Sequence, residues 1–131
     1  MTRAGTVPRS LALDKQVQVG TELVKAGANS MQTEGGSSAQ PSHAGTLGLI
    51  EKAAPTWAAA FEISRAVQVP VLCASGISSV TAPLAIGAGA AGVGVGSAVS
   101  QLNSEVAMIA VVRSLVEALA KVERSHFAAS M

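Results

Sequence analysis

The chain has 131 residues, enough for one domain with its own core, and a formal net charge of +1 from nine basic and eight acidic residues. This scattered, nearly balanced charge, together with an aromatic content of only 2%, argues against a nucleic-acid-binding surface. The single Cys73 cannot form a disulfide or a cysteine metal site within one chain, and no apolar run reaches the roughly 18 residues of a membrane-spanning helix. We therefore expect neither a metal site nor a membrane span.

The first third of the chain predicts one helix and one weak strand. Residues 1–13 contain basic residues and no acid, like a fragment of a transit peptide, and we expect an irregular segment there. Residues 14–26 place apolar residues on one side, and Gly27 follows as a stop signal, which predicts a helix. Residues 30–33 are a short, polar strand candidate.

The middle of the chain predicts a loop and then a helix that leads into a strand. The composition of residues 37–46 is that of a loop. Residues 56–67 predict a helix that Thr56 caps and that buries Trp57 and Phe61. The next predicted strand, Val71-Leu72-Cys73-Ala74, is continuously apolar, as in a strand buried on both faces.

The last third repeats the pattern of helix and strand. A helix capped within residues 78–81 runs to Gly89, and residues 92–96 form a strand of small residues. Asn103 is expected to cap the final helix, in which apolar residues repeat at helical spacing as far as Leu119.

Helices and strands thus alternate strictly over residues 14–124, and residues 125–131 are expected to form a tail. Alternation of this kind predicts an α/β fold with a parallel sheet and right-handed crossovers. Three strands cannot close a barrel, which needs about eight. The chain is therefore expected to be the C-terminal portion of a (β/α)8 barrel, three βα units preceded by a helix, or else a small open sheet with a partner.

Two glycine-rich loops follow the last two predicted strands. Ser75, Gly76 and Ile77 lie in the first loop, and Gly96 and Ser97 in the second. Glycine lets backbone N–H groups turn toward a ligand, serine adds a hydroxyl, and the start of a helix favours an anion. Because the loops after strands seven and eight of (β/α)8 barrels form a phosphate site, the pair predicts a phosphate-bearing small-molecule ligand. The alternative is that the small residues merely relieve packing.

The end of the first predicted strand supplies further candidate site residues. Gln32, Gly35 and Gly36 are candidates for ligand contacts, and Glu34 lies at the rim where barrel enzymes place catalytic groups. His43, in the polar loop on the same rim, has the right chemistry for proton transfer near neutral pH. A solvated carboxylate and a surface histidine are the alternatives for these two catalytic candidates.

From Leu23 to Leu119 the chain resembles a known family, the conserved hypothetical chloroplast reading-frame protein that is number twenty-three in its series. The matching motifs are QTEGG, HAGTLGLIEKAAPT, PVLCASGIS, APLAIGAGAAGVGVGSAV and LNSEVAMIAVVRSLVEAL. The resemblance implies a (β/α)8 barrel of unassigned activity, with strands six to eight present in this chain and the front strands missing. It also implies a plastid location, or the cytoplasm in a cyanobacterium.

The order of motifs is similar, more loosely, to that of flavin-dependent barrels such as nitronate monooxygenases, which implies FMN as a candidate cofactor. In this chain His43 lies seven residues beyond Gly36 rather than beside it. The expected function is therefore binding of a phosphate-containing metabolite or FMN at the last two loops, with enzymatic activity left open. The alternative is a non-catalytic structural or regulatory barrel fragment that needs a completing half-barrel or a second copy, as in a homo-oligomer.

Overall fold

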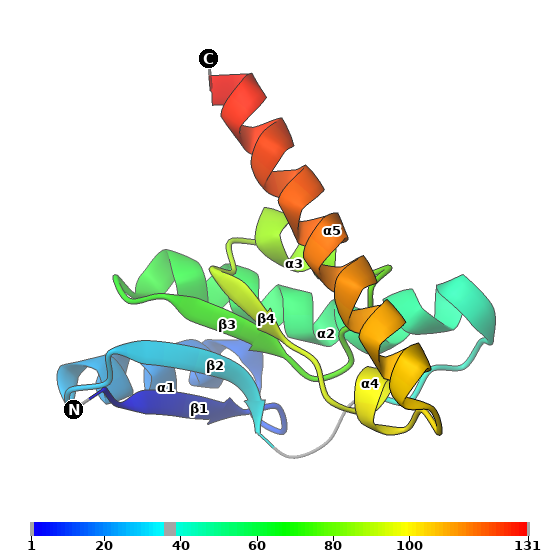
Figure 1. Ribbon diagram of the computed structural model, residues 1–131. Coiled ribbons are helices and arrows are strands. Elements are labelled where there is room, and N and C mark those ends of the chain that lie inside the picture. Colours follow the sequence, from blue (N-terminus) through cyan, green and yellow to red (C-terminus); the bar gives the residue numbers. More distant parts are fainter. Residues whose placement is uncertain (1, 36–38, 131) are drawn as a thin grey trace.

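The computed structural model describes the backbone of residues 2–35 and 39–130, and the side chains of residues 2–33 and 39–122. Within these residues the strands form one parallel sheet in the order β1-β2-β3-β4 (Figure 1). The strands are β1 (Ala4–Pro8), β2 (Ser30–Gly35), β3 (Val71–Ala74) and β4 (Gly92–Gly94). Neighbouring strands in the sheet are therefore also neighbours in the chain, as expected for successive βα units.

A helix connects each strand to the next. The helices are α1 (Leu13–Lys25), α2 (Gly45–Ala66) and α3 (Ala82–Gly87), followed after β4 by α4 (Ser97–Ser100) and α5 (Glu105–Ser130). Figure 1 shows α1 and α2 lying behind the sheet, and α5 packs on α3 and α4. None of the described helices is both long enough and apolar enough to cross a membrane.

The two faces of the sheet differ in what covers them. Val7, Met31 and Val71 point toward the helices and are buried in a core that α1 and α2 complete. On the other face Thr6, Gln32 and Leu72 stand side by side in register, and all three retain contact with solvent. In a closed barrel such a row points into the interior.

The inner face of α2 is built from small residues. Ala53, Thr56, Ala60 and Ile63 recur at helical spacing and are all buried. Because three of these side chains are short, the long helix can lie close to the sheet.

The expectation of an irregular segment over residues 1–13 is wrong, because Ala4–Pro8 form β1. This strand pairs in parallel with β2, and the N–H of Arg3 donates to Oδ1 of Asn29 at 3.0 Å just before the ladder begins. Its burial alternates strictly, with Gly5 and Val7 inside. The segment is short and contains Gly and Pro beside its two β-branched residues, Thr6 and Val7, so its strand propensity is weak and pairing with β2 decides its conformation.

Two helices are longer than the sequence predicts. Residues 45–55, in part assigned to a loop, form the first half of α2, and Pro55 lies inside this helix. Ser104 rather than Asn103 caps α5, since its Oγ accepts the N–H of Ala107 at 3.3 Å. The helical backbone continues through Ser130, over most of the expected tail.

Phe61 and Leu72 are more exposed than predicted. Phe61 lies on the outer side of α2, where the guanidinium of Arg65 stacks 5.0 Å above its ring. Trp57, in contrast, packs against the core as expected. Leu72 is exposed because its part of the side of β3 away from the helices is uncovered, although Ala74 on the same side is buried.

Candidate functional site

The loop after β3 adopts an unusual backbone conformation. Ser75 and Gly76 both have positive φ, 81° and 73°, in the region that L side chains disfavour. The carbonyl oxygen of Ser75 accepts a hydrogen bond of 2.9 Å from the hydroxyl of Thr56 on α2. The loop is therefore held against α2 in a shape that glycine makes accessible.

Gly76 lies directly against the backbone of α2. A Cβ added there would lie 2.7 Å from the carbonyl oxygen of Lys52 and 3.1 Å from its Cγ. Since the near atom is backbone, it cannot swing aside as a flexible side chain would. Position 76 thus requires glycine for its conformation and for the close approach of the loop to Lys52.

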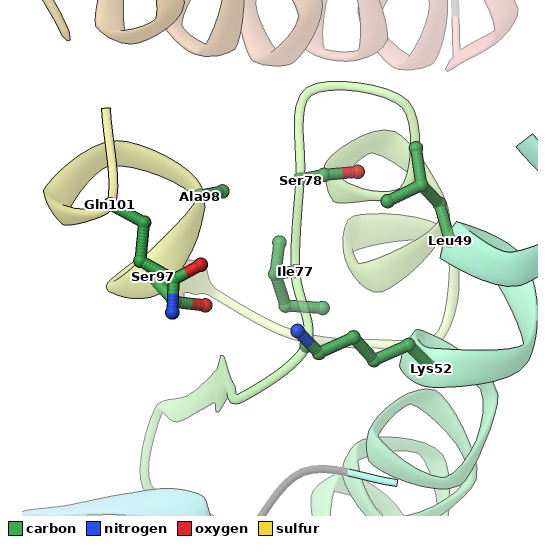
Figure 2. A pocket seen from close by; sticks show the side chains of 8 residues that line it. Leu49, Lys52, Ile77, Ser78, Ser97, Ala98 and Gln101 are labelled. Atoms are coloured by element: carbon green, nitrogen blue, oxygen red, sulfur yellow. The ribbon is translucent and has the colours of Figure 1, made fainter. Parts of the chain in front are cut away.

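Gly76 and Lys52, which are in close contact, form one wall of a pocket with a volume of about 220 Å³ (Figure 2). The lining residues come from α2, from the loop after β3 and from α4: Leu49, Lys52, Gly76, Ile77, Ser78, Ser97, Ala98 and Gln101. The two glycine-rich loops predicted to act together therefore do lie at one pocket. Of their five candidate residues, Gly76, Ile77 and Ser97 line it, whereas Ser75 and Gly96 lie beside it.

Lys52 is the cationic group of this pocket. Figure 2 shows its side chain extending from α2 past Ile77, so that the ammonium faces Ser97 and Gln101. The side chain is half-buried, and it forms no ion pair or hydrogen bond with any residue in the described part of the chain. A positive charge without a counter-charge favours binding of an anion.

Backbone donors lie next to this charge. The N–H groups of Gly76 and Ile77 have no hydrogen-bond acceptor among the described residues. The hydroxyl of Ser97 and the side-chain amide of Gln101 add neutral donors on the opposite wall. The pocket thus combines one cation with several neutral donors, and no carboxylate is among its lining residues.

Ser78 has a structural role in the pocket wall. Its N–H donates to Oγ1 of Thr81 at 2.8 Å, and the two hydroxyl groups lie 3.2 Å apart. In Figure 2 its hydroxyl points away from Ser97. The pair of side chains closes the turn that leads into α3, and the hydroxyl of Ser78 is therefore already engaged.

Sequence reasoning missed Lys52 because the helix was expected to begin at Thr56. Lys52 lies between the predicted loop of residues 37–46 and the predicted helix of residues 56–67, although it is part of the motif HAGTLGLIEKAAPT. The signal that could have found it is helical spacing. Lys52 lies one turn before Thr56, so a helix that starts at Gly45 carries both side chains toward the loop after β3.

His43 lies in the loop before α2 and is part of a polar cluster outside the pocket lining. Its Nδ1 is 2.9 Å from Oε1 of Glu51, and its side chain is 61% exposed. The hydroxyl of Ser42 donates to Oε2 of Glu51 at 2.6 Å. These hydrogen bonds, that from Ser42 first and that from His43 second, lower the pKa of the Glu51 carboxyl below its ordinary value of 4.5.

The remaining candidates belong to the end of β2. Gln32 lies on the uncovered face of the sheet, and the backbone of Glu34 and Gly35 completes the strand. The side chain of Glu34 and the whole of Gly36 lie outside the described residues.

Thr33 ties the ends of β2 and β3 together. Its hydroxyl accepts the N–H of Ala74 at 3.1 Å and lies 3.3 Å from the carbonyl oxygen of the same residue. The β2–β3 ladder pairs Met31 with Val71 and Gln32 with Leu72, so the side chain of Thr33 continues the connection where the ladder stops. This contact fixes the position of the loop that carries Gly76.

Cys73 is buried, as expected for a residue of the apolar run that forms β3. Its side chain is fully buried, and Sγ lies 3.7 Å from the carbonyl oxygen of Thr56. Burial raises the pKa of the Cys73 thiol to about 11. Within the described residues, no group of three His, Cys, Asp or Glu side chains is arranged to hold a metal ion.

Comparison with known sequences gives a family match over nearly the whole chain. The model described as "Protein of unknown function (DUF561)" matches residues 2–125. A protein described as "Uncharacterized protein ycf23" from Porphyra purpurea is 35% identical over 104 residues, which is 79% of this chain and 39% of that protein. The protein of the same description from Cyanophora paradoxa is 36% identical, over 79% of this chain and 42% of its own length. The chain therefore spans about two fifths of the curated relatives that it matches.

Comparison with solved structures identifies the fold. Wild-type GGGPS from Thermoplasma volcanium matches with a TM-score of 0.60 and 16% sequence identity, over 82% of this chain and 37% of the GGGPS chain. At this identity the likeness concerns the fold alone. Together with the four-stranded parallel sheet it confirms the predicted fold class, a portion of a (β/α)8 barrel.

Proposed function

This chain belongs to the DUF561 family of proteins of unknown function, and we propose that its pocket binds the phosphate group of a small molecule. The observation that carries the proposal is the ammonium of Lys52, which faces the donors of Ser97 and Gln101 across the pocket. The unpaired N–H groups of Gly76 and Ile77 complete the set of donors among the described residues.

The charge and donor pattern suits a phosphate better than a carboxylate or a metal ion. A phosphate offers several acceptor oxygens in a compact tetrahedron, and donors from three directions can each reach a different oxygen. Hydrogen bonds to an ionised group are roughly twice as strong as those between neutral groups. The cation at Lys52 supplies attraction, while the backbone of Gly76 and the side chain of Ser97 supply orientation.

The size of the pocket indicates how much of the ligand it holds. A volume of about 220 Å³ is below the roughly 300 Å³ at which pockets for complete drug-sized ligands begin. The phosphate and the atoms next to it fit, and the rest of the molecule extends over the carboxyl ends of the strands. Gln32 and Gly35 on β2 are our proposed contacts for that part, with Ser75 and Gly96 in the loops after β3 and β4, and with Gly36.

FMN is a phosphate ester of this class. The described residues fit its phosphate, since they offer one cation and several neutral donors. When bound, a flavin would supply electron transfer. The chain's own residues would hold the phosphate through Lys52, Gly76 and Ser97.

Proton transfer, in a reaction of the whole protein, would fall to Glu34 and His43. Glu34 lies near the end of β2 and His43 in the loop that follows it, at the carboxyl edge of the sheet, where barrel enzymes place their reactive groups. Nδ1 of His43 is hydrogen-bonded to Glu51. This bond orients the imidazole ring and leaves Nε2 available for proton exchange. The algal origin of the relatives supports a plastid location, or the cytoplasm for a cyanobacterial member.

Binding of inorganic phosphate, sugar phosphates and FMN, measured by calorimetry, tests the proposal. Lys52→Met is expected to weaken binding by at least tenfold, which corresponds to about 1.4 kcal/mol. Lys15→Met on α1 removes the same charge at an exposed site and is the matched control. Absence of binding by any phosphate compound to the unmodified chain, or equal loss in both variants, would contradict a site at this pocket.

A second candidate function is a non-catalytic structural or regulatory barrel fragment. The observation that favours it is the uncovered face of the sheet, where Leu72 is exposed beside Gln32. Such a fragment would associate with a partner and bind no phosphate. Calorimetry separates the two functions, because only the first of them predicts binding of a phosphate compound.

A further inference from the structure

Helix α5 has a wide apolar surface, and only part of it is packed on the core. Val111, Leu115 and Leu119 pack on the core, and Leu115 is buried. Beside them lies a stripe that consists of Val106, Ile109, Val112 and Val116, which are 46% to 76% exposed. An apolar stripe on a helix is typically packed against a neighbour, and the described residues leave this stripe exposed.

A hollow lies on this stripe. It has a volume of about 380 Å³ and is lined by Met108, Ile109, Val112 and Arg113. Three of the four lining residues are apolar, so the hollow fits apolar side chains of another protein surface better than a polar ligand.

The sheet ends on both sides in an unpaired strand. Among the described strands, β1 pairs only with β2, and β4 pairs only with β3. Neither AGTVP in β1 nor GVG in β4 contains a charged residue, although charges are a usual protection of free sheet edges. We define the seam as these two edge strands together with the stripe Val106, Ile109, Val112 and Val116.

We propose that a second copy of this chain covers the seam and closes an eight-stranded barrel. The chain contributes four parallel strands, so two copies provide the roughly eight that a closed barrel with a filled interior needs. The chain spans about two fifths of the length of the curated relatives that it matches, and its four described strands do not close a barrel by themselves.

The symmetry of this arrangement is defined by the strand directions. A two-fold axis parallel to the strands keeps every strand parallel and sets β4 of each copy beside β1 of the other. Both free edges of both copies are then paired by two equal junctions, as in the closed symmetric dimers that dominate among soluble oligomers. An axis across the strands would pair like edges in antiparallel fashion and leave the other edges open.

The stripe on α5 lies where this dimer needs an apolar surface. Because α5 follows β4, the new junction places it next to α1 of the second copy, as successive helices are neighbours around a barrel. Leu13, at the start of α1, is itself exposed and apolar. The uncovered row of Thr6, Gln32 and Leu72 becomes part of a shared interior.

Sedimentation equilibrium of the complete 131-residue chain over a wide concentration range tests the proposal. We expect a mass of twice 13.0 kDa, falling to the mass of a single chain for Val112→Glu and for Val116→Glu. Both side chains are exposed in the single chain, so folding of the variants, followed by circular dichroism, should persist. Leu84→Glu, at an exposed leucine of α3, is the matched control and should remain a dimer.

Hydrogen exchange provides the second measurement. In the closed dimer the amides of β1 and β4 are both protected, and protection is lost on dilution to the single chain. A monomeric chain at every concentration overturns the proposal, and so does a dimer that both glutamate variants leave intact. A dimer in which the edge amides exchange freely also overturns it, because the barrel is then not closed.

Discussion

The backbone of Gly76 packs against the carbonyl oxygen of Lys52, which would lie only 2.7 Å from a Cβ at that position. The residue that shapes the loop after β3 therefore touches the residue that supplies the positive charge of the pocket. Through this contact the geometry of the loop and the position of the cation depend on each other. Four predictions test this region and the core beneath it.

Gly76→Ala should destabilise the protein by about 1–3 kcal/mol, because alanine adds both a disfavoured backbone conformation and a clash with helix backbone. Binding of phosphate should weaken in the same variant. Chemical denaturation gives the free energy of unfolding. Gly87→Ala is the control, since a Cβ there meets no atom within 4 Å, and it should leave stability unchanged or slightly higher. Equal effects of the two substitutions would show that the contact with Lys52 is unimportant.

Thr33→Val should cost about 1–3 kcal/mol, although valine has almost the same shape. The substitution removes the hydroxyl that bonds both backbone groups of Ala74 and leaves them without a partner in a buried place. Thr6→Val, on the uncovered face of the same sheet, should change the free energy of unfolding by no more than about 0.5 kcal/mol. An unchanged free energy of unfolding for Thr33→Val would mean that other contacts hold the ends of β2 and β3 together.

The loop before α2 should loosen in acid. The pKa of Glu51 is lower in the folded chain than its ordinary value of 4.5, so its contribution to stability is complete above pH 4.5. That contribution is lost as the pH falls below 4.5 through the folded-state pKa, because the protonated carboxyl no longer accepts from Ser42 and His43. Urea unfolding at a series of pH values measures the slope. Glu51→Gln should flatten it, and an unchanged slope would assign the acid sensitivity to other carboxylates.

Cys73 should react with thiol reagents only after unfolding. Burial excludes the reagent and raises the pKa of the thiol to about 11, so the thiolate is scarce at neutral pH. Because the pKa is raised from 9.0, the thiol's contribution to stability is present below pH 9 and is lost as the pH rises toward 11. Labelling with a chromogenic disulfide, native and in denaturant, measures the difference. Rapid labelling of the native chain would contradict a closed core at β3.

Much of the fold could be predicted from the chain itself. The apolar run over residues 71–74 and the glycine-rich run that begins at Gly92 are β3 and β4, and the alternation with helices indicates a parallel sheet. The amphipathic helix over residues 14–26 is α1 within one residue at each end. These elements could be read because each carries its own local signal of periodicity or of a stop residue.

The elements that were missed have no such signal. β1 is a five-residue segment of small residues whose strand conformation depends on pairing with β2. The first half of α2 was hidden by Pro55, which normally marks a helix boundary but here lies inside the helix. The burial of Trp57 and the exposure of Phe61 were decided by the narrow inner face of small residues on α2.

The sequence by itself determined the class of fold and the pairing of the two glycine-rich loops, because strand–helix alternation and loop chemistry are local properties. Only the tertiary structure decided which groups meet at those loops. It brought Gly76 and Ser97 to one pocket, added Lys52 from a helix that begins earlier than expected, and left His43 bonded to Glu51. The physical reason is that a site is made by packing between segments distant in the chain, and no periodicity within one segment encodes the distance to another.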